Sequence, residues 1–430
     1  MEQAYRQAGV RHHNRVYAPL VVMWLLLVQR LHAGAPLETA VLELLRGLPA
    51  SFWPRPCKRI RNWQAQGQTL SSHTGAYNPA RQALPLSVVQ PSCDRIFEQL
   101  AARLAPTAGD QTTRAFVLDG TSLRMAHSPS LTKRFALGSN QHGAGHWPVA
   151  RMLVAHDLWT GLALRPEWGA MNGADAVSEQ QLLERAIGRV PSGATVIGDC
   201  NFGVFSVAYA AQQAGHPVLL RLTVARAQRL AGGALQGRMD RRVVWKPSRD
   251  DRRSHPHLPP DACVSGRLIV RQMRPDNGTE PFLLALFATL PSPCREIVKL
   301  YGQRWRIETD LRTLKTELCL DQLTCGTPDM AAKEIEMGIA AYHLVRAVIC
   351  LAAEPSGLPP RDYGFTKARR IVQVFAPQIA AASDARQAQR LFEQMMHYLQ
   401  QAKLPHRRRK RPAYPREVWN RGAKFPNRKP

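Results

Sequence analysis

Four polar side chains recur at regular steps in the segment YGQRWRIETDLRTLK, which covers residues 301–315. On an α-helix, where each residue turns the chain by about 100°, Tyr301, Arg304, Glu308 and Lys315 share one narrow stripe. The stripe presents one carboxylate flanked by two cations and a phenol. A carboxylate can hold a divalent cation and the cations can bind phosphates, so this face suits phosphate chemistry assisted by a metal ion.

Two other acids of this helical segment are expected to face away from the stripe. By the same geometry, Asp310 and Glu317 fall about 180° and about 160° from Tyr301. Neither is therefore expected to share a metal ion with Glu308. Tyr301 has an alternative role, in which it packs the helix against the rest of the protein.

Two isolated aspartates upstream each end an apolar run that predicts a β-strand. Asp119 follows RAFVL and Asp199 follows ATVIG, where a carboxylate has no packing role. With Glu308 they offer three oxygen ligands, which suit Mg²⁺ or Mn²⁺. Two such ions at one phosphate activate the attacking oxygen and stabilise the leaving one. The alternatives are local: Asp119 could form a turn with Gly120 and Thr121, and Asp199 could cap the next helix.

The charge of the chain indicates the kind of partner. Its 430 residues include 58 Lys+Arg and 32 Asp+Glu, which gives a net charge of +26. An excess this large, spread over the whole chain, favours a polyanionic partner, and nucleic acid is the commonest one. A merely basic protein, such as a ribosomal one, is the alternative.

The spacing of the cysteines and one apolar run indicate the cellular compartment of the protein. The eight cysteines form no C-x-x-C pair, which excludes a zinc ribbon or a dithiol redox site and is typical of reduced cytosolic thiols. The apolar run at residues 16–29 superficially resembles a secretory signal but is too short to span a bilayer. It continues into a second amphipathic stretch, LETAVLELLRGL, so we interpret the two as a pair of buried helices, with the secretory signal as the alternative.

The elements that must position these residues form an α/β pattern with helical ends. Residues 1–108 are expected to form a helical, basic, DNA-binding region. Alternating strands and helices over 109–223 predict the first part of a mixed-sheet core. Three strand-like runs in 224–295 predict a β-rich insertion. Residues 296–352 would complete the core with the Glu308 helix, and 353–430 would form a helical region with a basic tail.

Two basic stretches are candidate DNA contacts. In FWPRPCKRIRNWQAQG, Trp53 and Trp63 alternate with cations, which suits either a DNA contact or a basic loop with two tryptophans packed beneath it. Residues 403–430 hold eleven Lys+Arg and a single acid, Glu417. Such a tail is expected to remain extended until it meets nucleic acid.

The acids and the stripe together resemble a known family. The chain is similar to bacterial insertion-sequence transposases of the DDE class, specifically the large family marked by Y-x2-R-x3-E-x6-K. Tyr301, Arg304, Glu308 and Lys315 match that signature, VLDGTSL resembles the strand of the first aspartate, and VIGDCNFG resembles that of the second. The resemblance covers residues 110–350 well, the tail fairly and the first hundred residues loosely.

The resemblance implies a ribonuclease-H-like core with a β-strand insertion before the glutamate. It implies Asp119, Asp199 and Glu308 as catalytic metal ligands for two Mg²⁺ or Mn²⁺ ions, and Tyr301 and the two stripe cations as phosphate contacts. The implied activity is cut-and-paste transposition: cleavage at the transposon ends, release through a DNA hairpin, and strand transfer into target DNA. The implied partners are terminal inverted repeats, target DNA and a second copy in a synaptic homodimer, within the bacterial cytoplasm at the nucleoid and without a membrane.

Two positions depart from the pattern of the family. Many relatives have a basic residue after the second aspartate, where this chain has Cys200, so one phosphate contact is in doubt. Hairpin-forming relatives use an aromatic residue of the insertion to receive a flipped base. Trp245 and Phe282 are the candidates here. Packing in the core is the favoured role for Phe282, and for Trp245 packing and DNA binding are balanced.

Three functions fit the sequence. We favour an active transposase, because the insertion and the basic flanking regions accompany all three acids. A structure-selective nuclease with the same core is the second possibility, and cleavage that depends on specific terminal repeats would separate the two. The third is a DNA-binding protein that has lost catalysis, which the intact set of acids disfavours.

Overall fold

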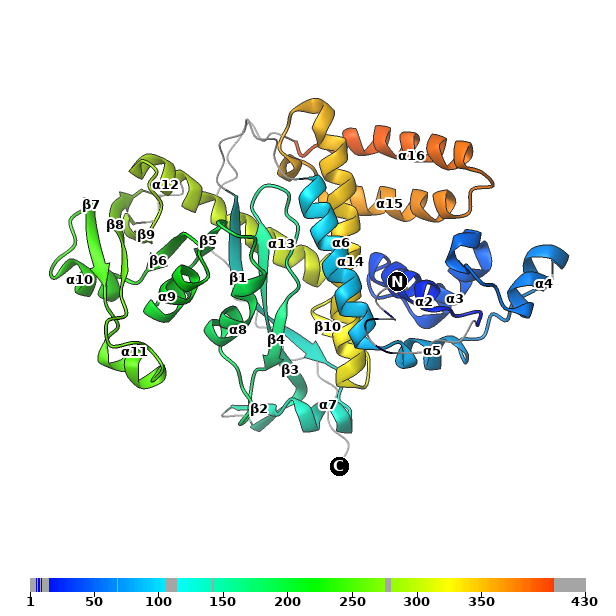
Figure 1. The fold of residues 1–430 in the computed structure, drawn as a ribbon, viewed down its shortest axis with the longest axis horizontal. Helices are drawn as coiled ribbons and strands as arrows, with labels where there is room; N and C mark the ends of the chain where they lie inside the picture. The colour runs from blue at the N-terminus through cyan, green and yellow to red at the C-terminus, as the bar shows by residue number, and fades with distance from the viewer. Residues whose placement is uncertain are drawn as a thin grey trace.

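A computed structural model of the chain describes residues 5, 7, 9, 15–67, 69–104, 114–140, 143–274 and 280–405. The predicted basic tail lies, from residue 406 onward, outside the described residues. Figure 1 shows a central sheet with the N-terminal helices on one side and a group of strands on the other.

The strands of the described residues form one mixed sheet of ten strands. Their bounds are β1 Ala115–Met125, β2 Leu137–Asn140, β3 Gly143–Asp157, β4 Glu167–Ala170, β5 Thr195–Gly198, β6 Val218–Leu222, β7 Arg238–Trp245, β8 Val264–Met273, β9 Phe282–Ala288 and β10 Gln322–Leu323. The order across the sheet is β2-β3-β1-β5-β6-β9-β8-β7, with β4 paired to β3 and β10 paired to β1. The expected α/β core with a mixed sheet, consistent with a ribonuclease-H-like fold, is therefore confirmed.

The central strands are apolar on both faces because helices cover both sides of the sheet. Val117 and Ile197 belong to one hydrophobic cluster, and Phe116 and Val196 belong to another on the opposite face. This alternation follows from the two-residue period of a strand. The parallel pairs β1–β5 and β5–β6 thus form the buried centre of the sheet.

The helices divide between the two faces and the N-terminal region. Those of the N-terminal region are α2 Pro19–Leu31, α3 Leu37–Arg46, α4 Lys58–Gln66, α5 Tyr77–Ala83 and α6 Leu86–Arg103. Those that follow are α7 Pro129–Arg134, α8 Glu179–Ala186, α9 Phe205–Gln213, α10 Val224–Ala231, α11 Arg249–Ser254, α12 Cys294–Gly302, α13 Arg306–Arg312, α14 Pro328–Ala353, α15 Phe365–Ala380 and α16 Ala385–Gln400. Helices α8, α9 and α10 cover one face of the sheet, whereas α13 and α14 cover the other.

Helix α14 joins the N-terminal region to the core. It contacts α2 and α6, and α6 runs beside it in Figure 1. It is apolar and long enough to cross a membrane, but 89% of its most apolar window is buried inside the protein. The apolar run at the N-terminus forms α2, which is likewise buried, and α3 packs on it, so the prediction of two buried helices is confirmed.

The tryptophans of the basic N-terminal stretch pack beneath it. Trp53 is buried, its indole N–H donates to the carbonyl of Val16 at 2.8 Å, and its ring meets the edge of Trp63. The neighbouring cations Lys58 and Arg59 are exposed. The rings therefore support the loop, while the cations remain accessible to a partner.

The predicted insertion extends the sheet instead of standing apart from it. β9 pairs antiparallel with β6, and β8 and β7 follow in order toward the edge. β7 pairs only with β8 among the described strands, and its sequence RMDRRVVW is rich in arginine. Charged side chains on an edge strand discourage pairing with another chain.

The segment 301–315 does not form one regular α-helix, so this part of the prediction is wrong. Helix α12 ends at Gly302, a 3₁₀ turn, η3, spans Gln303–Trp305, α13 follows, and a π-helical turn, η4, spans Thr313–Glu317. The chain remains right-handed helical throughout, but the rotation per residue changes at each junction. The rotation of about 100° per residue therefore applies within α13 but does not hold over the whole stripe from Tyr301 to Lys315.

A close backbone approach behind the second aspartate gives a stability prediction. A Cβ atom at Gly203 would lie 2.0 Å from the carbonyl oxygen of Arg221, and that backbone atom cannot move away cheaply. We expect Gly203→Ala to lower the free energy of unfolding by about 1–3 kcal/mol, the usual cost of overpacking. Urea unfolding followed by circular dichroism measures the change.

The matched control is Gly188→Ala, because nothing lies within 4 Å of a Cβ atom at Gly188. Its free energy of unfolding should change by less than about 1 kcal/mol. Equal stability of the two variants would show that the loop at Gly203 is looser than the structure indicates.

Candidate active site

Asp199 directly follows Gly198, the last residue of β5, whereas Asp119 lies within β1. Because β1 continues to Met125, the predictions that Asp119 ends its strand or forms a turn with Gly120 and Thr121 are wrong. The last residue pair in register between β1 and β5 is Val117 with Ile197. Asp119 and Asp199 each come two residues later, so they share the sheet face of that pair. This is the face covered by α13 and α14. The register therefore places both carboxylates toward the helix that contains Glu308.

Local hydrogen bonds orient both carboxylates. Asp119 accepts from the backbone N–H of Gly120 at 2.8 Å, and Asp199 accepts from the backbone N–H of Asn201 at 2.8 Å. The helix that follows, α9, has Val204 at its N-cap and no side-chain cap. The alternative in which Asp199 caps that helix is therefore wrong. The bond to Gly120 leaves Asp119 free oxygen lone pairs for another ligand.

Burial and neighbouring acids raise the pKa of Asp119 to about 6. Burial is the main cause, and the carboxylates of Asp199 and Glu179 add to it, whereas the N–H of Gly120 and the cation Arg304 lower it. Crowded carboxylates whose ionisation is disfavoured in this way are typical of functional sites. A divalent cation would relieve the repulsion among them.

Glu308 is connected to the aspartates through Arg304. A guanidinium nitrogen of Arg304 lies 3.2 Å from a carboxylate oxygen of Glu308, one helical turn away. Arg304 is also close enough to Asp119 to lower its pKa. The Glu308 side chain remains 41% exposed, so it can exchange this partner for another.

Tyr301 and Lys315 differ in how the structure holds them. Tyr301 is buried, and its hydroxyl has no hydrogen-bond partner among the described residues. Burial raises its pKa to about 12, so it remains a neutral phenol that can donate a hydrogen bond. Lys315 lies half-buried in η4, and the described residues place no hydrogen-bond partner on its ammonium group. Packing and phosphate binding are compatible roles for Tyr301.

Two residues beside the aspartates were not identified from the sequence. Arg221 on β6 is next to Asp199 in the register that pairs Gly198 with Leu220. Glu179, the first residue of α8, accepts a hydrogen bond from the side-chain amide of Asn201. These positions depend on how β6 and α8 pack, which no spacing in the sequence reveals.

Gly120 explains how Glu179 comes so near. A Cβ atom at Gly120 would lie 2.0 Å from a carboxylate oxygen of Glu179. The absent side chain therefore lets the Glu179 carboxylate rest against β1, near enough to Asp119 to raise its pKa. A glycine immediately after Asp119 was the only signal of this approach in the sequence.

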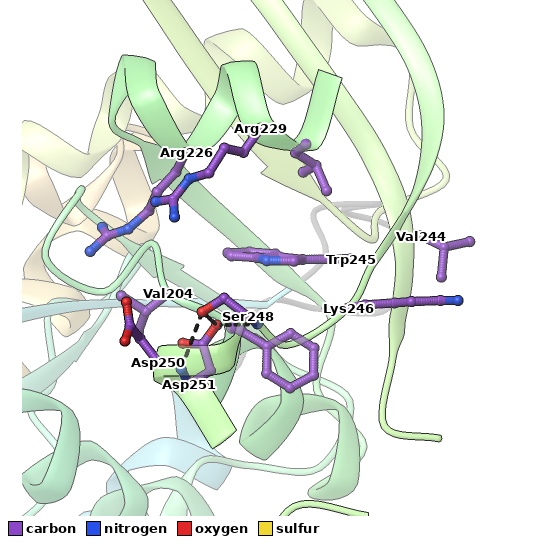
Figure 2. A pocket seen from close by; sticks show the side chains of 11 residues that line it. Val204, Arg226, Arg229, Val244, Trp245, Lys246, Ser248, Asp250 and Asp251 are labelled. Carbon is purple, nitrogen blue, oxygen red and sulfur yellow. Dashed lines mark hydrogen bonds between the residues drawn. The ribbon is translucent and has the colours of Figure 1, made fainter. Parts of the chain in front are cut away.

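A hollow adjoins the loop that follows Asp199. It is a pocket of about 480 Å³ lined by Val204, Phe205, Arg226, Arg229, Leu230, Val244, Trp245, Lys246, Ser248, Asp250 and Asp251. Figure 2 shows the indole of Trp245 in the middle of the lining, with Arg226 and Arg229 on one side of it. Trp245 also meets the edges of Phe205 and Phe287, so it both packs and lines the pocket.

Arg226 places a cation beside position 200, where this chain has Cys200 instead of a basic residue. Its guanidinium donates to the backbone carbonyl of Cys200 at 2.9 Å. A cation from α10 thus stands beside this loop although the residue after Asp199 is a cysteine. The departure from the family pattern therefore does not remove positive charge from this part of the site.

Phe282 is exposed, which contradicts its predicted packing in the core. Its side chain is 43% exposed, and the guanidinium of Arg221 lies 5.9 Å from the centre of its ring. The reason is its position at the start of β9, three residues before β9 begins to pair with β6 at Ala285. Together with Arg221, it forms an accessible aromatic and cationic pair at the edge of the sheet that holds the aspartates.

The donor chemistry of the site fits a hard divalent cation. Asp119, Asp199 and Glu308 all offer carboxylate oxygens, which Mg²⁺ and Mn²⁺ prefer. Among the described residues, no three His, Cys, Asp or Glu side chains converge closely enough to hold an ion as they stand. Glu308 bonds to Arg304, so its carboxylate must leave that partner to join the aspartates.

Comparison with known proteins agrees with this arrangement. A family model described as the transposase DDE domain matches residues 110–344. The transposase InsG for insertion sequence element IS4 of Escherichia coli (strain K12) is 23% identical over 312 residues, which cover 72% of this chain and 68% of that protein. The family match spans more than half of the chain and includes both aspartates and Glu308. The chain therefore belongs to the DDE transposase family.

Proposed function

We propose that this transposase cleaves DNA strands at the ends of its insertion sequence and transfers them into target DNA. One observation supports this most strongly. The parallel register of β1 with β5 sets Asp119 and Asp199 side by side on the sheet face covered by the helix of Glu308. Carboxylate oxygens are the ligands that Mg²⁺ and Mn²⁺ prefer, and such ions assist phosphoryl transfer.

Asp119, Asp199 and Glu308 would hold two Mg²⁺ or Mn²⁺ ions. When bound, the ions supply activation of the attacking oxygen and stabilisation of the leaving one. The neutral phenol of Tyr301 donates a hydrogen bond to a phosphate oxygen, and Arg304 and Lys315 neutralise phosphate charge. Arg304 bonds to Glu308 in the protein alone, and DNA would offer that guanidinium a phosphate in exchange.

The same site would act on double-stranded DNA as part of a homodimer, with each copy cleaving one end. The net charge of +26 supports a polyanionic partner of this size. Exposed cations on α4 and the arginines of β7 are the described surfaces best suited to the DNA backbone. The terminal inverted repeats and the target would then be held at opposite sides of one catalytic centre.

Trp245 would receive an unpaired base during a hairpin step. Its ring is half-buried in a pocket whose lining also has Arg226, Arg229 and Lys246, so an aromatic surface and phosphate-binding cations occur together. Base stacking on an aromatic ring with cations nearby is a general mode of binding unpaired nucleic acid. Phe282 with Arg221 offers a second aromatic surface at the sheet edge.

The catalytic assignment predicts the effect of Glu308→Gln. The change keeps size and hydrogen-bonding shape but removes the negative charge that a divalent ion needs. Nicking of labelled end DNA should fall by about 10²-fold or more, while DNA binding stays nearly unchanged. Asp119→Asn and Asp199→Asn should behave alike. Nicking assays with Mg²⁺ and binding assays run in parallel measure both quantities.

Glu296→Gln is the matched control, because Glu296 is an exposed acid on α12, in the same helical stretch. It should nick as the unaltered protein does. Robust nicking by Glu308→Gln would mean that another acid holds the metal. Cleavage that ignores the terminal repeats would identify a structure-selective nuclease instead of a transposase.

The raised pKa of Asp119 predicts how nicking depends on pH. With a pKa of about 6, Asp119 is mostly protonated below pH 6, where protons compete with the metal ion. The Mg²⁺ concentration for half-maximal nicking should be nearly constant from pH 7 to pH 8. It should rise about fivefold between pH 6 and pH 5. Titrations of Mg²⁺ at each pH test this, and a flat dependence down to pH 5 would contradict it.

The role of Trp245 predicts a selective loss of affinity. Trp245→Ala should weaken binding to ends with an unpaired terminal base by about 1–3 kcal/mol, the contribution of one stacked base. Binding to fully paired ends should change little. Val244→Ala is the control, since Val244 lines the same pocket and is 55% exposed. Fluorescence anisotropy with the two DNA forms separates these outcomes, and equal losses for both variants would exclude base stacking.

A further inference from the structure

On the face of α13 opposite Glu308 lies a fully buried carboxylate, that of Asp310. Asp310 is 0% exposed, and its Oδ1 accepts from Arg346 at 2.7 Å and from the hydroxyl of Tyr342 at 3.1 Å. Its Oδ2 accepts from Arg361. The expectation that Asp310 faces away from the stripe is therefore confirmed, and the residue is bound on every side by the protein interior.

The partners of Asp310 come from two separate elements. Tyr342 and Arg346 lie on α14, and Arg361 lies on the 3₁₀ turn η6, Pro360–Asp362. Arg361 also donates to the backbone carbonyls of Asp157 at 2.8 Å and Leu158 at 3.1 Å, at the end of β3. One carboxylate thus connects α13 to α14, to η6 and, through Arg361, to the strand that pairs with β1.

This carboxylate is charged in the folded protein. Burial by itself would raise the pKa of Asp310, but Arg361 and Arg346 outweigh burial and hold it at about 2. His156 lies 3.8 Å away, and burial lowers its pKa to about 4, so it is neutral near pH 7. A buried ion pair of this kind contributes little net stability compared with apolar packing, but its geometry is strictly directional.

Helix α13 needs such a directional contact. Its seven residues belong to an unbroken helical stretch from Cys294 to Glu317, and the pitch changes at the 3₁₀ turn before α13 and at the π-helical turn after it. Its buried apolar residues, Ile307 and Leu311, hold it against the core, and apolar contacts are less directional than hydrogen bonds. Glu308 and Asp310 are two positions apart, about 200° around the helix, so any rotation that moves one moves the other.

We infer that Asp310, clamped by Arg346, Arg361 and Tyr342, is a positioning residue that fixes the rotation of α13 and so aims Glu308 at the two aspartates. The inference rests on the proposed role of Glu308 as a metal ligand. It assigns a catalytic consequence to Arg361, which lies beyond the residues that match the family model. Positioning contacts behind a metal ligand commonly change metal affinity by about 10–100-fold.

Arg361→Ala tests this inference in the full-length protein. The variant should require about tenfold more Mg²⁺ for half-maximal nicking, should regain more activity with Mn²⁺ than with Mg²⁺, and should bind end DNA normally. Isothermal titration calorimetry with Mn²⁺ should show a similar loss of affinity in the absence of DNA. A purely structural role would lower the unfolding temperature without changing the metal dependence of the folded fraction.

Arg369→Ala is the matched control. Arg369 is similarly buried and pairs with Glu317 at 2.9 Å, so it ties η4 to α15 as Arg361 ties α13 to η6. Its loss should leave the Mg²⁺ requirement unchanged. An equal shift in both variants would overturn the inference, because the effect would then belong to any lost ion pair of this region.

Arg361→Lys decides the case if Arg361→Ala fails to fold. Lysine keeps the positive charge but lacks the planar fork that bonds Asp310 and two carbonyls together. It should raise the Mg²⁺ requirement in the same direction, and an unchanged requirement would refute the inference. If the unaltered protein shows no metal-dependent nicking, the proposed function fails, and the calorimetric comparison with Mn²⁺ still tests the positioning role.

Discussion

The parallel pairing of β1 with β5 is the constraint on which the rest of the site depends. Both strands are apolar on both faces, so helices must cover both sides of the sheet. A shift of register by one residue would turn every side chain to the wrong face. The same packing that forms the core therefore fixes Asp119 and Asp199 next to each other. Every other part of the site is brought to these two carboxylates by a separate element.

The site combines two opposing electrostatic demands. Carboxylates that share a cation must lie close together, but burial and the nearby carboxylates of Asp199 and Glu179 raise the pKa of Asp119 and so disfavour its charged form. Arg304 lowers the pKa of Asp119 in the protein alone, and Arg221 lies on the neighbouring strand β6. Both cations are also suited to phosphates, so the groups that stabilise the free protein can turn to the substrate when it binds.

Much of the chemistry could be predicted from the sequence because it follows local rules. Asp119 and Asp199 were recognisable as acids that directly follow apolar strand residues, although β1 continues past Asp119 to Met125. Arg304 and Glu308 were recognisable as residues one helical turn apart. The three strands after residue 224 were also evident from their composition. These features need only the period of a strand or a helix.

The remaining features depend on contacts between distant segments, which no period encodes. Glu179 reaches Asp119 only because α8 packs over Gly120, and Phe282 is exposed because β6 pairs with only part of β9. The helical segment that contains the buried Tyr301 changes to 3₁₀ geometry at Gln303 and to π-helical geometry after α13. The partners of Asp310, including Arg361, could not be assigned from spacing for the same reason.

The placement of Arg361 after the insertion also sets an order of assembly during translation. The nascent chain can pair β1 with β5 soon after Asp199 is made, but the ion pairs of Asp310 on α13 form only once Arg346 and Arg361 exist. Residues 200–361 take roughly 8–32 s to add at about 5–20 residues per second. Bringing the ends of so long a segment together costs chain entropy. The ion pairs of Asp310 offset that cost only after Arg361 has been added. The surroundings of the three acids are thus completed late, after most of the polypeptide has been synthesised.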